Sequence, residues 1–240
     1  MSFPRDGREV EADARLAVAA GFDIIATGDH LRHPRDRDMP LLDGWSVLTA
    51  WAATTDQLHV AMLVSNLIYR HPVLVAKQAI AVDQLCGGRL DLAVGAGVYP
   101  TDHAMAGVPP WSAAERVTRL AEFLQALDGA LRGDESFDGQ IYRFSGASWS
   151  PGPVQQPRPP IAVGAVGPRM LRLAAEQADV WSAFGGIAVE DEEAFFSSLQ
   201  DQIRTLDQAC HAHGRDPKSL RRSLLAFRPL ASWRSIHTLE

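Results

Sequence analysis

The chain is predicted to fold as an α/β barrel of the TIM-type (β/α)8 class, from its length, its alternating elements and the place of its glycines. Its 240 residues, 46% of them hydrophobic, suffice for one large core and approach the roughly 250 residues typical of such barrels. Short apolar runs alternate with amphipathic stretches, which predicts parallel strands joined by helices. One such run, over 90–94, stops at Gly95 and Gly97. The carboxyl ends of the strands are where barrels of this class keep their active sites.

Three alternations of helix and strand fill the first hundred residues. Asp6 and Glu9 form a capping pair for the first helix, which Gly21 ends. Strands are expected in short apolar runs, and helices in longer runs with apolar residues at helical spacing. In order, the elements are a helix over 8–20, a strand over 22–27, a helix over 45–55, a strand over 59–65, a helix over 72–85 and a strand over 89–94.

A long excursion rich in Gly, Ser and Pro interrupts the second half of the chain, over residues 132–160. A segment of this length in a compact domain is typical of a functional flap or a disordered stretch. A helix over 113–131 precedes it, and it is followed by strands over 161–163, 180–183 and 223–227, a helix over 169–177 and a helical region over 189–213. No clear break marks a second domain, so residues 1–240 are predicted to form a single domain with this loop excursion.

Composition and charge exclude several classes of protein. The formal net charge of -6 and the scattered Lys and Arg residues give no footprint for nucleic acid. No apolar stretch reaches the roughly 18 residues needed to span a membrane, and no signal-peptide region is evident. Cys86 and Cys210 match no metal or redox spacing. A metal site built from His30, His33 and Asp36 lacks a further ligand at matching spacing. We therefore expect a cytoplasmic protein without membrane, nucleic-acid or metal partners.

An open dinucleotide-binding sheet is the alternative to the barrel. That fold places G-x-G-x-x-G directly after a strand. In this chain Gly95 and Gly97 are followed by Pro100 where the third glycine is required. The mismatch favours the barrel.

A series of short motifs, in order and with consistent gaps from about residue 8 to residue 230, resembles the bacterial luciferase-like, flavin-dependent oxidoreductase family. The motifs are Phe22-Asp23, Gly28-Asp29-His30, Tyr69-Arg70-His71-Pro72, Ala76-Lys77, Gly87-Gly88-Arg89-Leu90, Gly95-Ala96-Gly97, Arg116 and Ala178-Asp179-Val180-Trp181. The resemblance implies a barrel that uses reduced flavin or the deazaflavin coenzyme F420, acts on a small molecule and forms a homodimer.

Compared with that family, the barrel is expected to be incomplete. Only residues 1–6 precede the first helix, and they make a poor strand because Pro4 lies among them. Residues 231–240 resemble the loop that opens a last helix. The first and last strands are therefore predicted to be missing, which leaves two strand edges that a partner, a terminus or the excursion would have to cover. Either the sequence is shortened or the barrel is incomplete, with reduced or lost activity.

Asp29 and His30 directly follow a predicted strand, so their side chains are expected at the barrel mouth. An imidazole can give or take a proton while a hydride moves, and an adjacent carboxylate can orient it or hydrogen-bond a ring system. The plain alternative is that Asp29 caps the next segment and His30 fills a polar crevice. The resemblance implies catalytic roles for both, with Asp29 also at the cofactor, and favours F420, with FMN as the alternative.

The resemblance places the flat ring of the cofactor against Leu63, Val64 and Ser65, with a cis peptide between Leu63 and Val64. An ordinary buried strand would use these residues equally well. Relatives usually carry Gly-Thr where this chain has Ala61-Met62, which adds bulk near the ring.

Further cofactor contacts are implied at Gly95, Gly97 and Asp102. The cofactor phosphate is placed near the loop formed by Gly164, Ala165, Val166 and Gly167. The residues themselves leave two alternatives, a phosphate cradle at a helix start opened by Pro168, or a plain turn.

The substrate is expected to be a small to medium organic molecule. Sugar-phosphate dehydrogenases of the family carry an acidic residue where this chain has Val98, and basic anchors where it has residues 184–187, so a sugar phosphate is not expected. An apolar pocket is one reading of Trp45, Tyr99, Trp111 and Phe184, and core packing is the other.

Two functions follow from these observations. The first is an oxidoreductase that transfers a hydride, or activates oxygen, through a reduced deazaflavin or flavin cofactor at the barrel mouth. The second is a catalytically weak flavin- or ligand-binding protein derived from a luciferase-like monooxygenase.

Overall fold

The computed structural model describes residues 1–33, 36–184 and 192–225. The chain divides into two compact units, Met1–Val163 and Gly164–Glu240, and each is described by itself. The single domain predicted over 1–240 stays a prediction. The predictions for residues 185–187, for the start of the 189–213 helical region, for the end of the 223–227 strand and for 231–240 lie outside the described residues.

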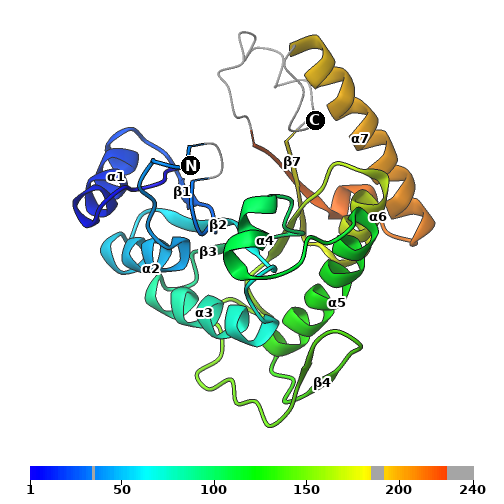
Figure 1. The fold of residues 1–240 in the computed structure, drawn as a ribbon, viewed down its shortest axis with the longest axis horizontal. Helices are drawn as coiled ribbons and strands as arrows, with labels where there is room; N and C mark the ends of the chain where they lie inside the picture. Colours follow the sequence, from blue (N-terminus) through cyan, green and yellow to red (C-terminus); the bar gives the residue numbers. More distant parts are fainter. Residues whose placement is uncertain (34–35, 185–191, 226–240) are drawn as a thin grey trace. The chain divides into compact units, whose positions relative to one another are not determined.

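The first unit contains a parallel sheet with helices between its strands (Figure 1). Its elements are α1 (Gly7–Ala19), β1 (Ile24–Thr27), α2 (Gly44–Thr54), β2 (His59–Asn66), α3 (Pro72–Leu85), β3 (Leu90–Gly95), α4 (Pro100–Ala106), α5 (Ala113–Arg132), β4 (Phe137–Asp138), β5 (Arg143–Phe144) and β6 (Ile161–Gly164). Strand β1 pairs with β2, β2 with β3 and β3 with β6, all parallel. The α/β fold with parallel strands is thus confirmed, and its closure into a barrel without the first and last strands stays a prediction.

The helices of the first unit begin where the sequence supplies caps. The Asp6 carboxylate accepts hydrogen bonds from the backbone of Arg8 and Glu9, which opens α1. Helix α2 packs on β1 and β2, and α3 packs on β3. The core under these helices contains large side chains with almost no exposure, and it includes Trp45. Since Trp45 is only 2% exposed, it belongs to the core and not to an apolar pocket.

The outer edge of β1 is partly covered by the amino-terminal residues. The backbone N–H of Ser2 donates to the carbonyl of Ala26 at 2.8 Å. A Cβ added at Gly28 would meet the side chains of Met1 and Phe3 at 3.1 Å. The sequence analysis named a partner, a terminus and the excursion as possible covers for a strand edge. At β1 the amino terminus takes this place.

The excursion is held firmly against the first unit. The fully buried carboxylate of Asp83 accepts hydrogen bonds from the backbone N–H groups of Val154 and Gln155, at 2.7 and 3.0 Å. Further along, Arg158 forms an ion pair with Asp128 of α5. A disordered stretch is therefore not what the structure shows, because these hydrogen bonds fix the segment on α3 and α5. The hairpin of β4 and β5 lies within it.

Neighbouring side chains explain the glycine that ends β3, Gly95, and the one two residues later, Gly97. A Cβ at Gly95 would lie 2.3 Å from Val64 Cγ2, and one at Gly97 would lie 2.5 Å from Ile68 Cγ1. Gly97 also has a φ of +68°, a conformation that favours glycine. The close approach predicted at these glycines is therefore made by Val64, which lies on β2, and by Ile68, which follows it.

Substituting Gly97 with alanine is expected to destabilise the fold more than the same change at Gly107. Both glycines have a φ of +68°, but a Cβ at Gly107 would meet nothing within 4 Å. The left-handed conformation costs about 1–2 kcal/mol in either variant, and the clash with Ile68 adds about 1–3 kcal/mol at Gly97. Urea unfolding of the two variants measures the difference, and equal losses would contradict the packing argument.

The second unit contains α6 (Pro168–Gln177), β7 (Val180–Ala183), α7 (Glu192–Ala212), a short 3-10 helix (Pro217–Ser219) and β8 (Arg221–Leu224). Strands β7 and β8 are parallel, and α6 packs against α7. The indole N–H of Trp181 donates to the carbonyl of Ala165 at 2.9 Å, which ties β7 to the loop before α6.

Candidate functional site

The candidate site of the first unit lies where β1, β2 and β3 end. Asp29 and His30 follow β1, Asn66 ends β2, and Asp102 lies on α4, which follows β3. Because parallel strands end at the same edge of a sheet, residues far apart in sequence meet here. Their hydrogen bonds form two groups, one around Asp29 and one around His30.

The first group holds the carboxylate of Asp29, which is only 2% exposed. Arg70 binds both of its oxygens, with Nε 2.6 Å from Oδ2 and Nη2 2.8 Å from Oδ1. The backbone N–H of Asn66 and the hydroxyl of Ser65 also donate to Oδ2, at 3.0 and 3.3 Å. The hydroxyl of Tyr69 donates to the backbone carbonyl of Asp29. The side chain and the main chain of Asp29, the residue directly before His30, are therefore both fixed.

Arg70 is the central cation of this group. Its Nη2 lies 3.0 Å from Oδ1 of Asp43, and its guanidinium lies over the rings of Trp45 and Tyr69 at 6.0 and 5.6 Å from their centroids. Burial acts to lower the pKa of Arg70, but the hydrogen bonds and charge of Asp29, followed by those of Asp43, outweigh it and raise the pKa. The Arg70 side chain is 10% exposed, so its charge is largely committed to these partners.

Two neighbours of Arg70 have shifted pKa values. Burial, followed by the negative charges of Asp29 and Asp102, raises the pKa of the Tyr69 hydroxyl, which keeps it a neutral donor. Burial acts to raise the pKa of Asp43, but hydrogen bonds from Ser46 and the charge of Arg70 outweigh it and lower the pKa. Asp43 therefore stays ionised beside Arg70.

The second group holds the imidazole of His30. Its Nδ1 lies 3.0 Å from Oδ2 of Asp102, and the same oxygen accepts a hydrogen bond from Nδ2 of Asn66 at 2.9 Å. Asp102 is 1% exposed, whereas the His30 side chain is 18% exposed. The ring of Tyr99 stands edge-on to His30 at a centroid distance of 5.3 Å. Among the described residues, nothing hydrogen-bonds the other imidazole nitrogen, Nε2.

The carboxylate that orients His30 is therefore Asp102, although the sequence suggested Asp29 for this task. Asp29 binds Arg70 instead. Its two oxygens accept four hydrogen bonds in all, and none of them comes from His30. Asp102 was expected only as a cofactor contact.

The residues expected behind the ring lie on β2. The peptide between Leu63 and Val64 is cis, as the resemblance implied, and both side chains are half-buried. Ser65 is buried and accepts a hydrogen bond from the Trp45 indole at 3.3 Å. Met62 is fully buried, so the extra bulk of this position lies in the core.

The remaining aromatic residues expected at a pocket are divided between the two units. In the first unit Tyr99 and Trp111 are half-buried, and the Trp111 ring packs against His103 and under the guanidinium of Arg119. Phe184 is described with the second unit. The apolar pocket stays a prediction for Tyr99, Trp111 and Phe184.

In the second unit, the predicted phosphate loop forms the start of α6. Gly164 ends β6, Ala165 is buried, and Val166 and Gly167 lead to Pro168 at the first turn of the helix. Gly167 is the N-cap and no side chain caps the helix. A Cβ at Gly167 would meet nothing within 4 Å. Within the described part of the chain, no side chain accepts from the amides at this helix start, and such amides are the donors that a phosphate needs.

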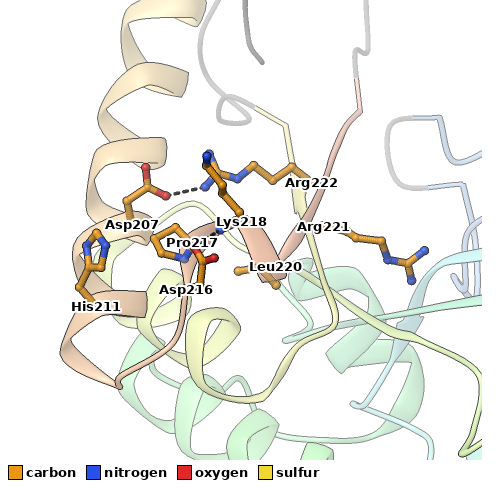
Figure 2. A pocket seen from close by; sticks show the side chains of 8 residues that line it. All are labelled: Asp207, His211, Asp216, Pro217, Lys218, Leu220, Arg221 and Arg222. Atoms are coloured by element: carbon orange, nitrogen blue, oxygen red, sulfur yellow. Dashed lines mark hydrogen bonds and ion pairs between the residues drawn. The ribbon is translucent and has the colours of Figure 1, made fainter.

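A separate surface cleft of the second unit contains none of the predicted site residues (Figure 2). It is lined by Asp207, His211, Asp216, Pro217, Lys218, Leu220, Arg221 and Arg222. Arg222 pairs with Asp207, Asp216 caps the short helix at Lys218, and Arg221 points away from the others. Since the cleft contains none of the predicted site residues and two of its charged side chains pair with each other, we do not take it as the functional site.

Neither a metal cluster nor a membrane-spanning helix is found among the described residues. No cluster of three or more His, Cys, Asp or Glu side chains there is arranged to hold a metal ion. None of the helices in the described ranges is both long and apolar enough to cross a membrane.

Comparison with known proteins identifies the family. The family model described as luciferase-like monooxygenase matches residues 4–231, and the chain belongs to this family. An uncharacterised protein of Mycobacterium tuberculosis is 33% identical over 189 residues, which cover 71% of this chain and 65% of the relative. A 5,10-methylenetetrahydromethanopterin reductase of Methanolobus tindarius is 29% identical over 210 residues, 86% of this chain and 57% of the relative.

A solved structure shows the same fold. An F420-dependent secondary alcohol dehydrogenase, in complex with an F420-acetone adduct, superposes with a TM-score of 0.78 at 20% identity, over 90% of this chain and 64% of that one. This chain thus spans about two thirds or less of the length of these proteins.

Proposed function

We propose that the protein is an oxidoreductase that works through reduced F420, with FMN as the alternative cofactor, and that His30 handles the proton. The observation that carries this proposal is the His30 imidazole at the carboxyl end of β1, with Nδ1 held by Asp102 and Nε2 without a hydrogen-bond partner among the described residues. An imidazole held in this way can exchange a proton with a substrate at Nε2.

The residues present fit a cofactor of this kind. Leu63 and Val64 are half-buried at the end of β2 and offer an apolar surface to a flat ring. In the second unit, the uncapped start of α6 offers amide donors to a phosphate. When bound, the reduced cofactor supplies the redox chemistry. In the first unit, the residues proposed to hold it are Asp29, Leu63, Val64, Ser65, Gly95 and Gly97. In the second unit, the loop of Gly164, Ala165, Val166 and Gly167 is proposed separately as a phosphate-binding loop.

The choice of F420 over FMN rests on Gly28-Asp29-His30 and agrees with the use of F420 by the structurally similar alcohol dehydrogenase. The substrate proposed is a small to medium organic molecule other than a sugar phosphate. The homodimer and the cytoplasmic location are also proposals, implied by the family resemblance.

Titration of the purified protein with F420 and with FMN, followed by absorbance, tests the cofactor. We expect F420 to change its spectrum on binding, at lower concentration than FMN. If FMN bound more tightly than F420, FMN would be the cofactor and the choice of F420 would be wrong. Absence of a spectral change with both would contradict it, and binding of either without any turnover of reduced cofactor would favour a ligand-binding protein.

A further inference from the structure

We propose that Asp102 and Asn66 are positioning residues that fix the tautomer of His30, so that Nδ1 carries the hydrogen and Nε2 is the atom that accepts a proton. The inference deepens the proposed function, on which its catalytic meaning rests. Its structural content concerns only residues of the first unit.

The argument starts from a donor whose identity is certain. The backbone N–H of Ile68 can only donate, and it points at one atom of the Asn66 side-chain amide at 3.1 Å. That atom must therefore be the oxygen. The orientation of the Asn66 amide, which is otherwise ambiguous by a flip, is thereby settled.

The other end of the amide must then be the NH₂ group, and it faces Oδ2 of Asp102 at 2.9 Å. An amide NH₂ only donates, so this oxygen of Asp102 is an acceptor. Asn66 is 5% exposed, which leaves its amide little freedom to turn away. Asn66 thus presents Asp102 to His30 as a hydrogen-bond acceptor.

The same oxygen, Oδ2 of Asp102, lies 3.0 Å from Nδ1 of His30. This oxygen already accepts a hydrogen bond from Asn66 and can accept a second one, so the ring nitrogen that faces it is the donor. Nδ1 therefore carries a hydrogen. In the neutral ring the second nitrogen must then be unprotonated, which makes Nε2 the proton acceptor.

The Asp29 group contributes a separate constraint. Since Tyr69 and Arg70 fix the main chain and side chain of Asp29, the residue next to His30 cannot move freely. The backbone N–H of Asn66 also donates to Asp29, so Asn66 joins the two groups. His30 is held in place through its main chain by the first group and in its tautomer by the second.

Nitrogen-15 NMR of the cofactor-free protein with labelled histidine tests the assignment. The two ring nitrogens have different shifts when protonated and unprotonated, and the signals lost in His30→Gln identify His30. We expect neutral His30 to have Nδ1 protonated, by about tenfold or more over the other tautomer, because a charge-assisted hydrogen bond favours it. Mainly Nε2-protonated His30 in the unaltered protein would overturn the proposal.

Two variants separate positioning from general packing. Asp102→Leu removes the acceptor and should abolish the excess of the Nδ1-protonated form, whereas Asp102→Glu keeps a carboxylate and should restore part of it. His59, whose Nδ1 lies 3.0 Å from Asp91 in an exposed pair, is the internal control and should not change. An unchanged His30 tautomer in Asp102→Leu would overturn the proposal. Failure of F420 and FMN to bind would leave this NMR result standing and contradict only the proposed function.

Discussion

Replacing Arg70 with methionine is expected to lower the free energy of unfolding by about 3–5 kcal/mol, the usual cost of leaving one member of a buried ion pair alone. Asp29 is 2% exposed and would keep only the hydrogen bonds from Ser65 and Asn66. Its charge would then be buried without a cation. Urea unfolding followed by circular dichroism measures the loss.

A double variant and a surface pair serve as controls. Removing the charge of Asp29 as well, in Asp29→Asn with Arg70→Met, should recover much of the stability, since no unpaired charge remains. Arg143→Met should cost less than about 1 kcal/mol, because its ion pair with Asp138 is largely exposed. If Arg70→Met proved no more harmful than Arg143→Met, the pair with Asp29 would not be structural.

Replacing His30 with glutamine is expected to slow turnover of the reduced cofactor about 100-fold or more, because the general acid–base group is lost. Cofactor affinity should change little, since the amide side chain fills a similar volume and His30 is not one of the residues proposed to hold the cofactor. Stopped-flow absorbance measures the rate, and the absorbance titration measures the affinity.

The chain offers a matched control for this change. His59 is the first residue of β2, at the amino end of the strands, and pairs with Asp91 at the same 3.0 Å distance as His30 with Asp102. His59→Gln should therefore leave turnover unchanged. Equal losses in the two variants would mean that His30 acts through stability, and unchanged turnover in His30→Gln would remove it from the chemistry.

The strands and helices were largely predictable because each carries its own local pattern. The capping pair of Asp6 and Glu9, for example, marks α1 before any packing is known. Boundaries were less predictable. The first strand starts at Ile24 and not at residue 22, and Phe22 is 66% exposed, because hydrophobicity alone does not tell whether a strand neighbour covers a side chain. Helix α4 was not predicted, since only seven residues between Pro100 and Ala106 carry its signal.

For the site, sequence located the strand ends but not the pairing between them. His30 and Asp102 are 72 positions apart, and no local pattern shows which carboxylate reaches the imidazole. Adjacency pointed to Asp29, whose true partner, Arg70, lies 41 positions away. Arg70 belonged to a recognised motif but had no assigned role, and Asn66 was not singled out at all. Long-range hydrogen bonds of this kind become visible only when the chain is folded.

The tight fit around Gly95 and Gly97 bears on how related sequences should be interpreted. Since Val64 and Ile68 leave no space for a Cβ at these positions, the pair would be retained in a descendant that had lost all catalysis. Its presence in a genome sequence therefore diagnoses the scaffold and says nothing about activity. A histidine at position 30 together with a carboxylate at position 102 is the more informative signature, because neither side chain is needed to fill that space.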